Sequence, residues 1–321
     1  MSSDVTLSEE LTDDEWLAEI QAFGETKGFY RPLGDSHAVI FADNSLKTLL
    51  VYFDTVQAAR ASNPSGLPQP IRIAEDLGWS HMTLLAKKAT WFRDLRVFRY
   101  FDRLVDDAFL EDFDRVVFFG VGPNGYAAAA FSVTAPGATV VAIAPQATLD
   151  PAVAEWDDRF IAMRRTSFTD RYGYAPDMVE AAERVFILYD PRVELDAMHA
   201  ALFRGANVER IRFRHAGPGI GREIMAMGAL RPILQEAGAG TLTATAAYRA
   251  LRTRHNYLPY LRNLLNEVHA EERDWLTVVL CRAALERKNA PRFQHHLELA
   301  EQRLLGSGRR LPESRSGAAG G

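Results

Sequence analysis

The sequence contains a single cysteine, Cys281, among its 321 residues. One cysteine cannot form an internal disulfide or a thiolate metal cluster, so a disulfide-stapled scaffold and a zinc-ribbon site are both excluded. Cys281 lies in an apolar stretch, which is typical of a packed core thiol and not of a reactive one. Spaced histidine ligands are missing too, because His295 and His296 are adjacent and point to different faces of a helix. We therefore predict no metal site.

The sequence also lacks an apolar run of about 18 residues, the length that a membrane-spanning helix needs. Its first residues include neither the basic nor the apolar segment of a secretory signal. The net charge of -5 gives no general attraction to nucleic acid or to anionic lipid. These absences predict a cytoplasmic protein that binds neither nucleic acid nor membranes. The 47% content of hydrophobic residues is ordinary for a globular chain.

Short apolar runs alternate with helical patterns through the middle of the chain. The runs that we predict to be strands are 38–41, 48–53, 82–85, 116–119, 139–144, 184–189 and 208–213. A helical stripe covers 91–110, and a further helix is predicted over 195–203. This alternation predicts the α/β class, with a mostly parallel sheet and helices on both of its faces.

The two ends of the chain have helical patterns in place of the alternating strand-like runs of this central region. A helical pattern over 7–23 begins at Ser8, a residue type that caps helices. Near the C-terminus, the segments with helical patterns are 243–252, 257–269, 274–285 and 291–305. We predict an N-terminal helical segment (1–37), an α/β domain (38–237), a C-terminal helical appendage (238–305) and a disordered tail rich in Gly, Ser and Arg (306–321).

A glycine-rich turn follows the strand predicted over 116–119. The stretch 116–132 reads VVFFGVGPNGYAAAAFS, which indicates a strand, a tight turn and an alanine-rich helix. It resembles the nucleophile elbow of α/β-hydrolases, where G-x-S-x-G joins a strand to a helix and small residues let a strained turn close. Gly120 matches the first glycine of that motif, and Gly122 takes the position of the serine.

The rest of the turn fits a variant of the same motif. Asn124 takes the position of the second glycine, and asparagine tolerates positive φ better than most residues. Gly125 and Tyr126 then match the G-x-S-x-G-G-Y form found in some bacterial hydrolase-like proteins. The resemblance covers about 38–237 and implies a three-layer α/β-hydrolase-like fold.

The resemblance also implies where a site would lie. Asp190 follows the strand over 184–189 and takes the position of the catalytic acid. His215 follows the last strand and takes that of the base. The order Gly122, Asp190, His215 is the Ser…Asp…His order of the family with glycine in place of serine. Phe53 and Asp54 lie where the oxyanion loop would be.

Two differences from the resembled motif bear on catalytic activity. Gly122 has no nucleophilic atom, and acyl-enzyme chemistry needs an oxygen or sulfur beside a base. Pro123 has no backbone N–H, although the residue after the nucleophile normally donates one to the oxyanion hole. We therefore expect no ordinary serine-hydrolase activity. Our leading hypothesis is a non-catalytic protein that binds a small molecule or a partner, with a cleft formed by Gly122, Pro123, Asn124, Phe53 and Asp54.

Other interpretations stay open. Asp190 and His215 could transfer a proton on a bound substrate, although Asp190-Pro191 is also an ordinary turn starter. The C-terminal helices could form a protein-interaction module. Gly120-x-Gly122-x-x-Gly125 formally matches a dinucleotide motif, but the next strand ends without the acidic residue that holds a ribose, so we predict no cofactor.

Two further segments have a structural and a functional interpretation. The loop 217–221 precedes a helix and could present N–H groups to an anion with the help of Arg222, or it could simply turn the chain. The charged segment 150–177 could form a lid over the cleft, or it could consist of solvated surface and internal ion pairs.

Overall fold

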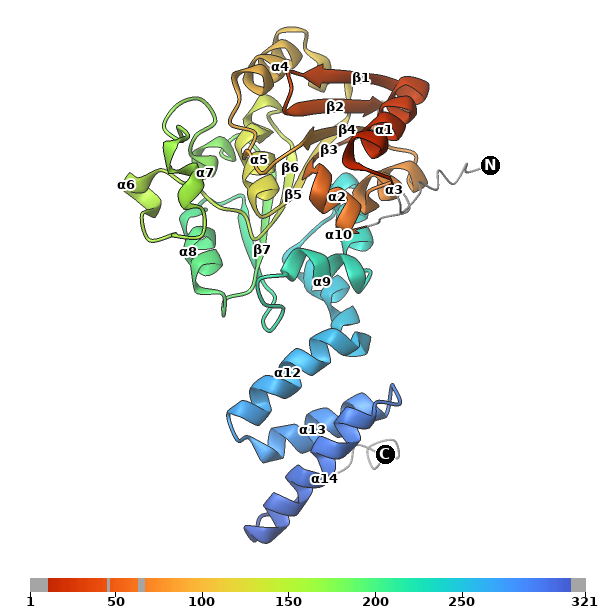
Figure 1. Ribbon diagram of the computed structural model, residues 1–321, viewed down its shortest axis with the longest axis vertical. Coiled ribbons are helices and arrows are strands. Elements are labelled where there is room, and N and C mark those ends of the chain that lie inside the picture. Colours follow the sequence, from red (N-terminus) through yellow and green to blue (C-terminus); the bar gives the residue numbers. More distant parts are fainter. Residues whose placement is uncertain (1–10, 45–46, 63–66, 313–321) are drawn as a thin grey trace. The chain divides into compact units, whose positions relative to one another are not determined.

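The predicted apolar runs assemble into one mostly parallel sheet of eight strands (Figure 1). The strands are β1 (Gly28–Leu33), β2 (His37–Ala42), β3 (Thr48–Thr55), β4 (Ser80–Ala86), β5 (Arg115–Val121), β6 (Thr139–Ile143), β7 (Arg184–Tyr189) and β8 (Val208–Arg212). Their order across the sheet is β1-β2-β4-β3-β5-β6-β7-β8. Neighbours from β4 to β8 are parallel, and β2 is antiparallel to both β1 and β4. This computed structural model describes residues 11–44, 47–62 and 67–312.

Helices cover both faces of the sheet. On one face lie α4 (Leu95–Asp106), α5 (Pro123–Phe131) and α8 (Glu194–Leu202). On the other lie α1 (Asp13–Lys27), α3 (Gln69–Asp76) and α10 (Leu230–Gly238), as Figure 1 shows. The shorter helices of this region are α2 (Val56–Ser62), α6 (Pro151–Ala154), α7 (Ala175–Met178), α9 (Ile220–Ala226) and α11 (Ala244–Ala250). The three-layer α/β architecture predicted from the sequence is confirmed.

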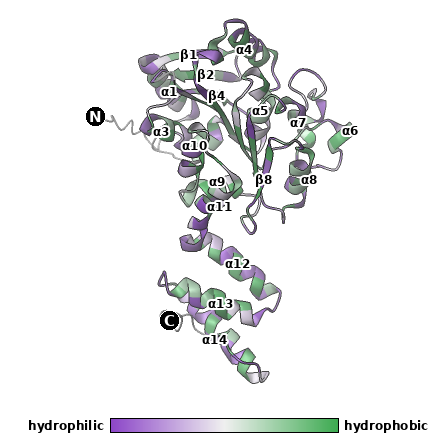
Figure 2. Ribbon diagram, turned by 180° about the vertical axis from the view of Figure 1, so that it is seen from behind, coloured by the Kyte–Doolittle hydropathy of each residue, from purple (hydrophilic) through white to green (hydrophobic). Residues whose placement is uncertain are grey.

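The continuous apolar run of β5 follows from its central position. Val116 and Phe118 pack in the core that includes α4 and α5, while Val117 and Phe119 point to the opposite face and are fully buried as well. Because both faces of a central parallel strand are covered, both sets of side chains must be apolar. Figure 2, which is coloured by hydropathy, shows that the central strands are mostly hydrophobic.

The edge strand β1 is absent from the sequence prediction, which placed residues 28–33 in a helical segment. Pro32 obscures it, because proline lacks the N–H that a central strand needs. At the edge of a sheet a proline is tolerated, and Pro32 there lies opposite Ala38 of β2. The N-terminal segment therefore contributes a strand as well as a helix.

Two helix boundaries also differ from the prediction. The stripe over 91–110 is helical only from Leu95, because Asp94 caps α4 by accepting from the Arg96 N–H at 2.7 Å. Trp91 and Phe92 before it have left-handed backbones (φ 52° and 56°). The first helix begins after Thr12, which forms a capping box with Glu15, while Ser8 lies outside the described residues.

The chain divides into two compact units, Met1–Ala250 and Leu251–Gly321. The first contains the sheet together with α11, which packs on β8, so the unit boundary follows residue 250 and not residue 237. The second contains the predicted C-terminal helices α12 (Leu258–Ala270), α13 (Asp274–Leu285) and α14 (Pro291–Gly306). Its small core includes Val278, Ala300 and Leu304. Residues 313–321 of the predicted tail lie outside the described residues.

The charged segment after β6 is attached to the domain by a buried ion-pair network. The Asp157 side chain is fully buried and accepts from His199 Nε2 on α8 at 2.9 Å. Arg159 binds Asp157 at 2.8 Å and Asp196 at 2.6 Å. The backbone N–H of Ala147 donates to His199 Nδ1 at 3.1 Å, so one histidine joins the segment to the helix twice. These contacts favour the internal ion-pair interpretation of the segment.

This network predicts acid sensitivity. Burial alone would raise the pKa of Asp157, but hydrogen bonds from His199 and Arg159 outweigh it and hold the pKa well below its usual range. A lowered folded-state pKa stabilises the fold above the unfolded-state pKa, and the contribution is lost as the pH falls. Stability should therefore decline below about pH 4. In Asp157→Asn we expect a loss of about 1–3 kcal/mol at neutral pH and a weaker acid dependence.

Urea unfolding at about pH 7 and pH 3 measures both effects. Asp158→Asn is the matched control, because Asp158 is the exposed neighbour and its change should stay within about 0.5 kcal/mol. An Asp157→Asn protein as stable as wild type at neutral pH would contradict the assignment.

Candidate functional site

The residues predicted from the sequence gather at one edge of the sheet. Asp54 is near the end of β3, Gly122 follows β5, and Asp190 follows β7. His215 comes three residues after the end of β8. Because these strands are parallel, their carboxyl ends meet at the same edge, which is where open α/β sheets bind ligands.

The turn after β5 has the geometry of a sharp elbow. Gly122 adopts φ 56° and ψ -123°, in the positive-φ range that favours glycine. Its N–H donates to the Ile143 carbonyl at 2.8 Å, and its carbonyl accepts from the Tyr126 N–H at 2.9 Å. Pro123 is the first residue of α5, where proline needs no hydrogen-bond partner for its nitrogen. A strand and a helix therefore flank the glycine turn, as the sequence predicted.

Gly120 and Gly122 differ in the space that their surroundings leave for a side chain. A Cβ at Gly120 would lie 2.2 Å from the Asn124 carbonyl oxygen, so the strand and the helix could not approach this closely with any other residue. A Cβ at Gly122 would meet nothing within 4 Å. The position that carries the serine in the resembled motif therefore faces open space, and here it presents only hydrogen.

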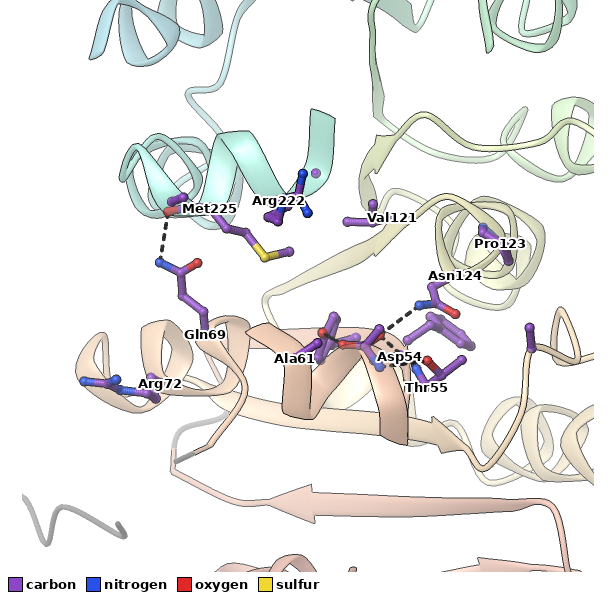
Figure 3. A pocket seen from close by; sticks show the side chains of 16 residues that line it. Asp54, Thr55, Ala61, Gln69, Arg72, Val121, Pro123, Asn124, Arg222 and Met225 are labelled. Atoms are coloured by element: carbon purple, nitrogen blue, oxygen red, sulfur yellow. Dashed lines mark hydrogen bonds between the residues drawn. The ribbon is translucent and has the colours of Figure 1, made fainter. Parts of the chain in front are cut away.

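A cavity of about 700 Å³ opens beside the elbow (Figure 3). Its described lining is mostly apolar and includes residues of β3, β5, α2, α3, α5 and α9. Polar side chains enter it at Asp54, Gln69, Arg72, Asn124 and Arg222. The volume and the few polar groups suit a small-molecule site.

Asp54 and Asn124 face each other in this cavity, as Figure 3 shows. Asn124 Nδ2 donates to Asp54 Oδ1 at 2.9 Å, and the Thr55 N–H donates to the same oxygen at 2.8 Å. The hydroxyl of Tyr52, two residues earlier on the same face of β3, donates to Oδ2. At the position of the second glycine of the motif, the Asn124 side chain therefore links the elbow to β3.

Burial dominates the electrostatics of Asp54. The side chain is almost completely buried, and desolvation raises its pKa to about 7 against the opposing effect of the Tyr52, Thr55 and Asn124 donors. Burial and the neighbouring carboxylate raise the pKa of Tyr52 well above its usual value. Asp54 therefore exists in both protonation states near neutral pH.

The acid and base suggested by the resemblance lie outside the cavity lining. Asp190 is buried and accepts from the N–H groups of Arg192 at 2.9 Å and Gly217 at 2.8 Å. The second bond holds the loop that carries His215, which is half-buried with φ 67°. Asp190, His215 and Gly122 are not among the described residues that line the cavity.

Phe53 lines the cavity, but its aromatic ring belongs to the hydrophobic core. The ring stacks with Phe101 at 5.9 Å and Phe131 at 5.7 Å between ring centroids. The predicted cleft residues Asp54, Pro123 and Asn124 do line the cavity.

Sequence reasoning missed most of the opposite wall. Gln69 and Arg72 on α3, and Met225 on α9, line the cavity, and Gln69 donates to the Met225 carbonyl at 3.4 Å. They come from segments with no motif, so no local signal marks them. Arg222 is the exception, because it follows the glycine-rich loop that the sequence singled out.

No group of three or more His, Cys, Asp and Glu side chains placed to hold a metal ion occurs in the described part of the chain. β6 leads into Ala144, Pro145 and Gln146, which supply no carboxylate for a ribose. No described helix is long and apolar enough to cross a membrane.

Comparison with solved structures finds distant likenesses. EstE1, a thermostable carboxylesterase cloned from a metagenomic library, is 12% identical over 75% of this chain and 99% of its own, with a TM-score of 0.44. MPT51 of Mycobacterium tuberculosis is 15% identical over 64% of this chain and 94% of its own (TM-score 0.40). Carboxyl esterase 2 of Tuber melanosporum is 12% identical over 63% of this chain and 82% of its own (TM-score 0.40). With TM-scores below 0.5, these likenesses carry no argument about this chain, whose own structure shows a mostly parallel sheet with helices on both faces.

No protein-family model and no curated protein sequence matches the chain. Likenesses this distant carry nothing about substrate or reaction. What this α/β domain does must therefore be argued from its own side chains.

The geometry of the elbow predicts how much stability is lost when each of its two glycines is replaced by alanine. In Gly120→Ala we expect a loss of about 3 kcal/mol or more, because the new methyl group meets backbone atoms that cannot move independently. In Gly122→Ala we expect a loss of only about 1–2 kcal/mol, because the methyl group enters open space and only the positive φ is strained. Urea unfolding of the two variants gives the comparison. Equal losses, or a larger loss at Gly122, would contradict this account of the turn.

Proposed function

We propose that this protein binds a compact, largely apolar molecule in the cavity beside the elbow and does not form an acyl-enzyme. The observation that carries the proposal is the elbow at Gly122, beside the cavity, where the nucleophile position of the resembled motif has no side-chain oxygen or sulfur. Pro123 supports it, since the next residue cannot donate an N–H to an oxyanion.

The cavity supports the binding part of the proposal. Ala58, Ala61 and Ala226 contribute small apolar surfaces, so side chains leave the space open to a ligand. Arg72 and Arg222 are exposed residues of the same lining and supply positive charge where the cavity meets solvent. A ligand with an apolar body and an electron-rich or anionic end fits this arrangement.

The binding proposal can be checked with 1-anilinonaphthalene-8-sulfonate, which has an apolar body and one negative charge. We expect its fluorescence to report binding, and Ala58→Trp to weaken that binding at least tenfold by filling the cavity. That factor corresponds to about 1.4 kcal/mol. Ala18→Trp is the matched control, an exposed helical alanine on α1 outside the lining.

A serine-directed fluorophosphonate tests the chemical part. We expect no covalent labelling of the wild-type chain. Labelling of a serine near the elbow would overturn the proposal, and so would dye binding that Ala58→Trp leaves unchanged.

A second candidate function concerns the C-terminal unit. Trp275, Leu276 and Val279 on α13 are 50%, 37% and 37% exposed. Their spacing of one, three and four residues puts them on one side of the helix. We propose that this surface, the α13 apolar face, contacts a protein partner, because exposed groups of large apolar side chains mark interaction sites.

Site-specific photocrosslinking tests this second candidate in the cells that produce the protein. With benzoyl-phenylalanine in place of Trp275 we expect a defined crosslinked band. The same probe at Glu286, an exposed position just beyond the end of α13, should give none. The idea fails if both positions give the same bands or neither gives any.

A further inference from the structure

The cavity contains a carboxyl group that the fold does not explain. Asp54 is the one carboxylate among the described residues of the lining. The hydrogen-bond donors that the described residues give it, from Tyr52, Thr55 and Asn124, are all neutral. An ionised carboxyl in an apolar wall is costly to keep without a cation beside it, and an asparagine could make similar hydrogen bonds at lower cost.

The surroundings of Asp54 suit proton transfer better than nucleophilic attack. Its two oxygens are fixed by three donors, which leaves the group oriented and only partly satisfied as an acceptor. Desolvation keeps it basic, with a pKa of about 7, so that the ionised form is abundant at neutral pH and the conjugate acid is still a useful donor. A group with these properties inside a cavity of this size is a candidate for function.

The charged groups that line the same cavity complement this carboxyl. Arg72 comes from α3 and Arg222 from α9, so both cations lie on elements other than the β3 strand that carries Asp54. Arg222 is 82% exposed and also lies 3.7 Å from Glu223, so it acts at the solvent side of the cavity. Cations placed there stabilise negative charge that develops on a substrate as its proton leaves.

We propose that Asp54 is the general base of this cavity and removes a proton from an activated C–H bond of a compact, mostly apolar carbon acid. The proposal rests on the binding function proposed above. It needs no nucleophile at Gly122 and no N–H from Pro123, so the two departures from the hydrolase motif do not impede it.

The step balances without any co-reactant. The ionised Asp54 oxygen takes the proton, and the electron pair of the C–H bond stays on the substrate. That pair either delocalises into an adjacent electron-withdrawing group, after which Asp54 returns the proton to a different atom, or it forms a new π bond as a leaving group departs with its own pair. In the second case Asp54 passes the proton to water.

The probe reaction is the ring opening of 5-nitrobenzisoxazole, a compact carbon acid. A base removes its C3 proton, the C–H pair forms the nitrile, and the N–O bond breaks to give coloured 2-cyano-4-nitrophenolate. We expect the intact chain to accelerate this reaction, with kcat/KM rising as the pH passes through about 7. In Asp54→Asn we expect kcat/KM to fall by about 100-fold or more, the usual contribution of a positioned base. Asp158→Asn is the control and should match wild type.

A second variant separates a base from a merely structural residue. Asn124→Ala removes one donor to the ionised carboxyl, so the midpoint of the pH–rate profile should move to higher pH. An unmoved midpoint in a variant with wild-type circular dichroism would overturn the assignment. This readout holds even if Asp54→Asn folds poorly.

Binding of 3-methyl-5-nitrobenzisoxazole, which has no proton at C3, distinguishes the two proposals. If calorimetry detects binding to wild type but Asp54→Asn opens the reactive compound as fast as wild type, the base assignment is wrong and the binding function stands. If the methyl compound does not bind at millimolar concentration, the binding function fails and the base assignment fails with it.

Discussion

The close approach of β5 and α5 at the elbow is the constraint on which the site depends. Gly120 lets the helix begin against the strand, and the backbone then passes Gly122 with positive φ before Pro123 starts the helix. Because the helix begins there, Asn124 falls within reach of Asp54 on the neighbouring strand β3. A turn opened by even one methyl group would move Asn124 and with it one wall of the cavity. The elbow therefore positions a polar pair even though it displays no nucleophile.

The polarity of the cavity follows from where each residue lies on its element. Tyr52 and Asp54 alternate with Phe53, so the polar pair faces the cavity side while the phenylalanine ring enters the aromatic core around α4 and α5. One strand thus serves both the fold and the site.

The sequence allowed the parallel strands and the strand–turn–helix unit at 115–131 to be predicted, because continuous apolar runs and a glycine turn are local signals. It did not reveal β1, since Pro32 is compatible with a strand only at an edge that the sequence does not mark. It named Asp54 only by analogy with an oxyanion loop. The bond to Asn124 spans 70 residues, and Arg72 and Met225 reach the cavity from helices without motifs, so only the assembled fold brings them together.

Both outer strands of the sheet bear features that disfavour strand-to-strand addition of another chain. On β1, Pro32 removes a donor from the open edge, and on β8 the run Glu209-Arg210-Ile211-Arg212 places charges along the other. Backbone pairing across such edges would leave donors unmatched or bring charges together. Strand-to-strand addition of another copy at either outer strand is therefore disfavoured in the native state.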